Sequence, residues 1–182
     1  MTTQQIILFA GGYLVELVVV IYFTRATARR VRGAMAGGAA AGLWGMSAIA
    51  LGEAVGCWHV PFASTPYFLP LFYLGLSISL MPIYLVTWQF ARRFGWRGLA
   101  VITCIVTVIG PPRDYFIAAM FPKWMVFAPG LAPILADAAA YAGIVILGHA
   151  LMRLVAGPAS EDRLARQPVE AAPSVVGPFV NT

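Results

Sequence analysis

Long apolar stretches separated by short arginine clusters restrict the fold of this chain more than any other feature. A membrane-spanning α-helix needs about 20 apolar residues. Of the 182 residues, 60% are apolar and 10% are charged, and five such stretches are present. The predicted spans are 6–24, 34–58, 68–90, 98–121 and 128–152. The sequence therefore predicts an all-α, polytopic membrane helical bundle of about five transmembrane helices and excludes a large soluble catalytic domain.

The positions of Lys and Arg predict the orientation of this bundle. Ten of the twelve basic residues lie in 25–32, in 92–97 and from Arg153 onward, and these segments share one side of a five-span bundle. Because basic loops are retained in the cytoplasm, we expect the N-terminus outside and the C-terminus inside a bacterial-type cytoplasmic (inner) membrane. The formal charge of +5 comes from these clusters, so nucleic acid is not an expected partner.

Two regions are expected along the chain. Residues 1–156 form the transmembrane domain, and residues 157–182, rich in Pro, Ala, Ser and charge, form a disordered cytoplasmic tail. The first apolar stretch could instead be a cleaved signal peptide. Its arginines follow the stretch and do not precede it, which favours a mature helix.

Pro111 and Pro112 interrupt the fourth predicted span. Proline removes a backbone donor and clashes with the preceding turn, so this helix is expected to be broken or kinked there. A break at membrane depth is tolerated only where it is buried in protein or lines a wet cavity. Arg113 and Asp114 follow directly, and the segment is therefore expected to line a polar site.

Five acidic or basic residues that carry a formal charge lie inside predicted spans, where charged side chains are costly and usually functional. They are Glu16, Glu53, Arg113, Asp114 and Asp137. At a rise of about 1.5 Å per residue, Glu16 and Asp137 fall near the midplane and the other three in the outer third. Consecutive helical residues point about 100° apart, so Arg113 is expected to pair with Glu53 in preference to Asp114.

Asp137 and Tyr141 are four residues apart and share one helix face with Gly148. This face is expected to point inward. Two interpretations of Asp137 remain open: a proton donor or relay, or a protonated carboxyl hydrogen-bonded to Glu16 or Tyr141. The candidate catalytic residues are Asp137 and Asp114. The candidate intramembrane polar cluster consists of Glu16, Glu53, Arg113, Asp114 and Tyr141.

A row of glycines follows one face of the second predicted span. Its members are Gly38, Gly42, Gly45, Gly52 and Gly56. Small residues let two membrane helices approach closely. The row could mediate self-association or bind a protein partner, but packing against another helix of the same chain is the favoured interpretation.

No cofactor and no metal are expected. His59 and His149 fall on opposite sides of the predicted membrane, which excludes a bis-histidine haem within one chain. Zinc, phosphate-loop and nucleophile-elbow motifs are absent from the sequence. Cys57 and Cys104 lie in different spans and are interpreted as buried apolar residues.

The chain has scattered intramembrane carboxylates and a Glu shortly before a Trp (Glu53 and Trp58). In these features it resembles small membrane enzymes acting on isoprenoids, such as lycopene cyclases. That resemblance implies acid chemistry on an apolar substrate, although the paired-acid motif of those enzymes is not found here. Three functions are therefore weighed. The favoured one is a non-catalytic subunit, scaffold or lipid-binding module. The alternative is an acid–base enzyme acting on an apolar lipid ligand, and the least favoured is a proton-coupled transporter using Glu16 and Asp137.

Overall fold

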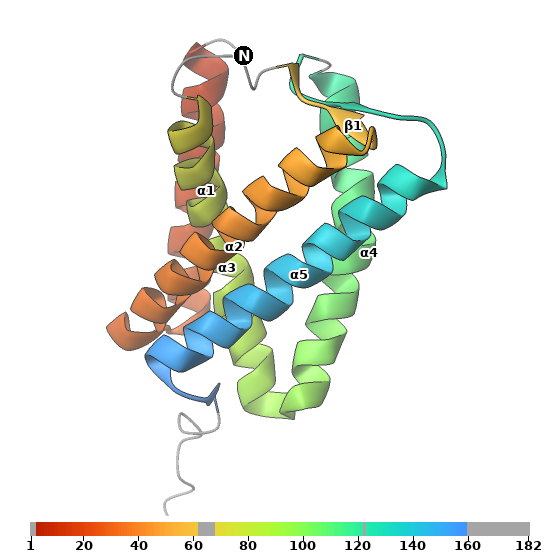
Figure 1. Cartoon of the computed structure of the whole chain (residues 1–182). Helices are drawn as coiled ribbons and strands as arrows, with labels where there is room; N and C mark the ends of the chain where they lie inside the picture. Colours follow the sequence, from red (N-terminus) through yellow and green to blue (C-terminus); the bar gives the residue numbers. More distant parts are fainter. Residues whose placement is uncertain (1–2, 62–67, 122, 160–182) are drawn as a thin grey trace, which may run out of the picture.

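The computed structural model describes residues 3–61, 68–121 and 123–159. The described chain forms five helices and two short strands (Figure 1). In chain order these are α1 (Thr3–Thr24), α2 (Ala28–Ala54), β1 (Trp58–His59), α3 (Phe68–Phe94), α4 (Trp96–Met120), β2 (Val126–Phe127) and α5 (Leu131–Ala156). The helical bundle predicted from the sequence is confirmed at this level. The tail expected from residue 157 lies outside the described residues from 160 onward.

Four helices, α2 to α5, are long and apolar enough to cross a membrane. In α1 the apolar stretch found among the described residues is the shorter segment Gly11–Thr24. The fold is thus that of a multi-pass membrane protein with four candidate spans. The fifth expected span, 6–24, coincides with most of α1 and stays a prediction.

The boundaries of α2 differ most from the predicted span of 34–58. The helix begins earlier because Thr27 acts as its N-cap and accepts a hydrogen bond from the backbone N–H of Arg30 at 3.4 Å. It ends earlier because Gly56 adopts a left-handed φ of 76° and turns the chain toward β1. The arginines predicted to form a loop therefore lie largely within the first turns of α2.

The helix α4 continues through Pro111 and Pro112 from Trp96 to Met120. The expected break does not divide it, although the two prolines withdraw two backbone donors from the helical ladder. A single residue, Gly95, connects α3 to α4 with a left-handed φ of 66°. This tight reversal makes α3 and α4 neighbours at one end, and Figure 1 shows them diverging toward the other.

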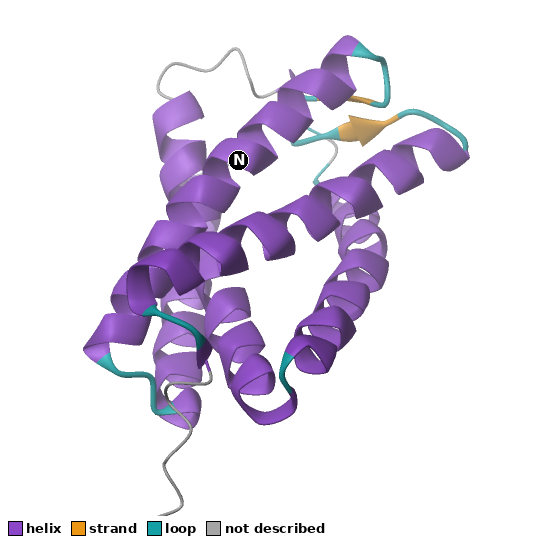
Figure 2. Cartoon of the chain, turned by 60° about the horizontal axis from the view of Figure 1, so that its bottom comes forward, coloured by secondary structure: helices purple, strands orange, loops and turns teal. Residues whose placement is uncertain are grey.

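The helix α2 packs between α3 and α5, whereas α4 packs on α5 and α3 (Figure 2). The core includes Tyr84 and Leu85 of α3 and Val145 of α5, all fully buried. The hydroxyl of Tyr84 donates to the carbonyl of Ile144 at 3.0 Å. The helix α1 lies on α3 at the side of the bundle, and this peripheral position matters for the site described below.

Most of the glycine row of α2 is covered by α3, which confirms the favoured interpretation of packing within the chain. A Cβ added at Gly38 would collide with the carbonyl oxygen of Ser77, and one at Gly42 with the hydroxyl of Ser77. At Gly45 it would lie 2.8 Å from Leu76. Two members differ: Gly52 faces the ring of Trp58, and Gly56 lies beyond the helix in the turn toward β1. The row is therefore not one continuous surface for another chain.

Candidate functional site

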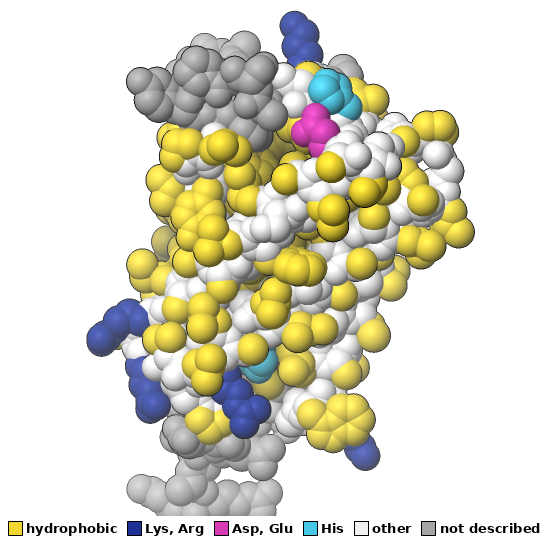
Figure 3. Space-filling view, viewed as in Figure 1, with side chains coloured by type: hydrophobic (Ala, Val, Ile, Leu, Met, Phe, Trp, Pro, Cys, Tyr) yellow, Lys and Arg dark blue, Asp and Glu magenta, His cyan; other side chains and the backbone are white. Residues whose placement is uncertain are grey.

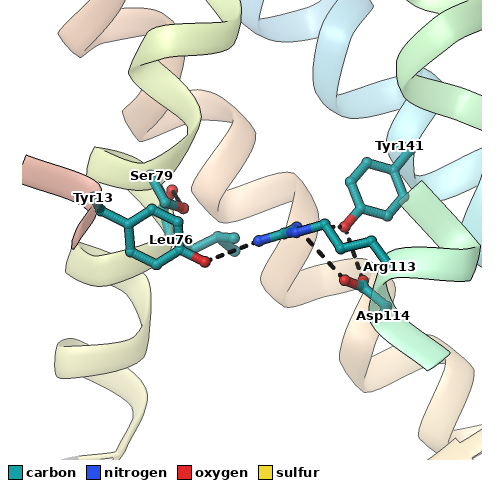
Figure 4. Close-up of polar contacts among 6 residues, drawn as sticks. All are labelled: Tyr13, Leu76, Ser79, Arg113, Asp114 and Tyr141. Carbon is teal, nitrogen blue, oxygen red and sulfur yellow. Dashed lines mark hydrogen bonds and ion pairs between the residues drawn. The ribbon is translucent and has the colours of Figure 1, made fainter. Parts of the chain in front are cut away.

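Arg113 of α4 connects three helices through its guanidinium (Figure 4). Nη1 donates to the hydroxyl of Tyr141 on α5 at 3.1 Å, and Nη2 donates to the hydroxyl of Tyr13 on α1 at 2.8 Å. The hydroxyl of Tyr141 in turn donates to Oδ2 of Asp114 at 2.9 Å. Oδ1 of Asp114 lies 3.6 Å from Nη1 of Arg113. We call Tyr13, Arg113, Asp114 and Tyr141 the Arg113 cluster.

A glycine makes room for this cluster. Gly110 is buried one turn before Arg113, and a Cβ at this position would collide with the ring of Tyr141. The bare backbone of α4 thus allows the Tyr141 ring to pack directly against it, which brings the phenol oxygen to Arg113 and Asp114. On α5, Asp137, Tyr141 and Gly148 are all buried, so the inward face predicted for this helix is confirmed.

The Arg113 cluster is not sealed inside the bundle. The side chain of Arg113 is 47% exposed and that of Asp114 is 31% exposed. In a membrane, uncovered surface meets lipid or another protein chain, and a cation there is costly unless it is paired. Asp114 and the two tyrosines offset that cost in part, while almost half of the Arg113 side chain stays uncovered.

Asp137 lies apart from these hydrogen bonds although it is the most buried carboxylate described. It is 7% exposed, and its Oδ2 has no hydrogen-bond partner in the described part of the chain. Asp114 and Arg113 are the charged groups that act on it electrostatically. The hydroxyl of Tyr115 is likewise buried without a partner, and the Tyr115 ring stacks on Phe127 of β2 at 4.0 Å between centroids. A buried polar atom without a partner is costly and marks either a functional group or a water site.

Glu53 does not pair with Arg113, so the contact expected from the sequence is wrong. Its Oε1 lies 2.8 Å from Nδ1 of His59 and accepts the backbone N–H of Val60 at 3.4 Å. The reason is the early end of α2, which places Glu53 in the last turn of the helix, directly below the strand β1. Glu53 thereby holds the chain as it enters the antiparallel pair of β1 and β2.

Glu16 lies on the exposed side of α1. Among the described residues it makes no hydrogen bond or ion pair. The partners considered for Asp137 were Glu16 and Tyr141, and neither is bonded to it, since the hydroxyl of Tyr141 is directed to Asp114. Of the five predicted cluster residues, the structure thus brings together Arg113, Asp114 and Tyr141 and leaves Glu16 and Glu53 elsewhere.

Sequence reasoning missed Tyr13, Tyr115 and Arg30. A tyrosine in an apolar stretch gives no signal that separates a hydrogen-bonding role from an interfacial one. Arg30 was interpreted only as an orientation signal, but it is 1% exposed and donates to the carbonyls of Gly157 at 2.6 Å and Pro158 at 3.1 Å. Its guanidinium also lies 5.4 Å from the centroid of the Trp88 ring. The available clue was that Arg30 lies in the first turn of α2, which directly follows the N-cap residue Thr27.

Within residues 3–61, 68–121 and 123–159, no group of three or more His, Cys, Asp or Glu residues is arranged to hold a metal ion. The site therefore consists of hydrogen-bonded tyrosines, one arginine and two carboxylates. Comparison with known proteins found no matching family model, no matching curated protein and no matching solved structure.

Proposed function

We propose that this chain is a non-catalytic membrane protein: a subunit, scaffold or lipid-binding module whose intramembrane polar groups hold its helices together. The observation that carries the proposal is the geometry of Arg113. Its two terminal nitrogens donate to tyrosines on two other helices, α1 and α5. Inter-helix hydrogen bonds of this kind stabilise membrane bundles, in which apolar burial provides little driving force.

The hydrogen bonding within the cluster supports the same proposal. The Tyr141 hydroxyl accepts from Arg113 and donates to Asp114, so both of its roles are used. A catalytic acid or base needs a free position from which a proton reaches the substrate. The hydroxyl proton of Tyr141 is used in the hydrogen bond to Asp114, and Arg113 lies beside both residues, which is typical of a structural network.

The proposed topology has five spans, with the N-terminus outside and the C-terminus inside the inner membrane of a bacterial-type cell. Lys and Arg side chains gather mostly at the end of the molecule where α2 begins and α5 ends (Figure 3). His59 and Glu53 lie with β1 at the opposite end. This charge asymmetry supports a cytoplasmic location for the arginine-rich end.

A second candidate function, acid–base catalysis on an apolar lipid, is favoured by Asp137 alone. Its Oδ2 is buried and unpartnered among the described residues, as a proton donor waiting for a substrate would be. Tyr115, whose hydroxyl is also unpartnered, would then be a second polar group in contact with the substrate. In this candidate the Arg113 cluster keeps its structural role.

Lipid extracts of membranes containing either the wild type or Asp137→Asn separate the two functions. The non-catalytic proposal predicts identical lipid profiles by mass spectrometry, because the amide preserves shape and no lipid is converted. Val145→Ala, which trims a buried side chain of the same helix, controls for a loss of folded protein. A lipid that accumulates with Asp137→Asn, but not with Val145→Ala at equal expression, would overturn the proposal in favour of the enzyme.

A further inference from the structure

Two opposite charges lie uncovered in the apolar part of this chain. The side chain of Arg113 is 47% exposed, and Glu16 lies on the exposed side of α1. The hydrogen bonds of Arg113 to Tyr13 and Tyr141 use two of its five N–H donors. Glu16 has no hydrogen bond or ion pair within the described ranges. Arg113 therefore has N–H donors left for a carboxylate, and the carboxylate of Glu16 lacks a cation.

The two groups lie at compatible depths. Glu16 follows Tyr13 by three residues, which is about 4.5 Å along the helix axis, and the hydroxyl of Tyr13 touches Arg113. Two copies inserted in the same direction are related by a twofold axis along the membrane normal, so that equivalent residues share one depth. Glu16 of a second copy would therefore lie within about one helical turn of the level of Tyr13, which Arg113 already reaches.

We propose that two copies of this chain associate through α1, with Glu16 of each copy paired to Arg113 of the other. The interface is isologous and contains the pair twice. The partner's Glu16 would cover the open side of the Arg113 cluster and supply a second carboxylate beside Asp114. The inference does not depend on the proposed function, since either a scaffold or an enzyme could be dimeric.

The surface of α1 around Glu16 can accept another helix. Gly12 precedes Glu16 by four residues and Val19 follows it by three, so the three residues share one face. All three are exposed, and a Cβ at Gly12 would meet no atom within 4 Å. The small residue permits close approach of a second backbone. This face is distinct from the glycine row of α2, which α3 covers.

Single-molecule photobleaching in lipid vesicles, over a series of protein-to-lipid ratios, measures the dimer dissociation constant. Glu16→Leu removes both pairs and is expected to raise this constant about 100-fold, or about tenfold for each pair. Val18→Leu, at an exposed position of α1 that does not share the face of Gly12, Glu16 and Val19, is expected to leave it unchanged. A wild type that stays monomeric, or a Glu16→Leu variant that dimerises as well as the wild type, would overturn the proposal.

Mixing two variants tests the crossed pairing. Glu16→Leu and Arg113→Leu each lose both pairs alone, but a mixed dimer keeps one pair between the intact Arg113 of one copy and the partner's Glu16. In an equal mixture, two-colour labelling should therefore show mixed dimers as well over half of all dimers, the share that random pairing would give. If Arg113→Leu does not fold, wild type mixed with Glu16→Leu also keeps one pair and should show intermediate affinity. A random half share of mixed dimers from the two single variants, or a mixed dimer of wild type and Glu16→Leu no tighter than the Glu16→Leu homodimer, would contradict the crossed pairing.

Discussion

Replacing Gly38 by alanine is expected to lower the free energy of unfolding by about 3 kcal/mol, the upper range for overpacking a close contact. The added Cβ would collide with the backbone carbonyl of Ser77 and lie 3.3 Å from Cγ of Met81. A backbone atom cannot rotate away as a side chain can, so α2 and α3 must separate. Titration with a denaturing detergent, followed by tryptophan fluorescence, measures the loss.

The matched control is Gly75→Ala on α3. An added Cβ at this helical position would meet nothing within 4 Å, and alanine is a better helix former than glycine. Its free energy of unfolding should rise by about 0.5–1 kcal/mol. The two variants make the same chemical change and are expected to differ in sign. Equal effects would show that Gly38 is not held against α3.

Replacing Arg30 by methionine is expected to cost about 4 kcal/mol, because two hydrogen bonds from a charged donor are lost and their acceptors are left unpaired. Those acceptors are the carbonyls of Gly157 and Pro158, directly after α5. The buried arginine therefore joins the start of α2 to the end of α5. Thermal unfolding in detergent measures the loss.

Arg32→Met provides the control for charge. It removes the same charge two residues away, but Arg32 is exposed, so a change within about 0.5 kcal/mol is expected. Both substitutions weaken the orientation signal equally, and a difference between them reports the buried contacts. Equal losses in stability would mean that Arg30 acts only through its charge.

Structural features that depend on helical spacing of residues were predictable from the sequence. The shared face of Asp137, Tyr141 and Gly148 follows from helical spacing, and all three are buried as expected. Glycine spacing on α2 likewise predicted close packing, and α3 provides it at Gly38 and Gly42. These predictions hold because side-chain direction along a regular helix depends on local geometry alone.

Features that depend on how helices are placed relative to one another were not predictable. Tyr13 and Arg113 are 100 residues apart, and no local pattern indicates that α1 lies where its tyrosine reaches α4. The expected pairing of Arg113 with Glu53 was wrong because α2 ends one turn earlier than predicted. The chain that follows the helix then brings His59 to Glu53. The continuity of α4 through Pro111 and Pro112 also could not be predicted from proline chemistry alone.

The central claim is that Arg113 ties α1 to α4 and α5 as a structural element. A double-mutant cycle of Tyr13→Phe and Arg113→Met tests it directly, measured as the free energy of unfolding at a protein-to-detergent ratio low enough to keep the protein monomeric. We predict a coupling energy of about 1 kcal/mol, the size of an inter-helix hydrogen bond in a membrane. Strictly additive losses would show that the two side chains do not interact, and would contradict the account.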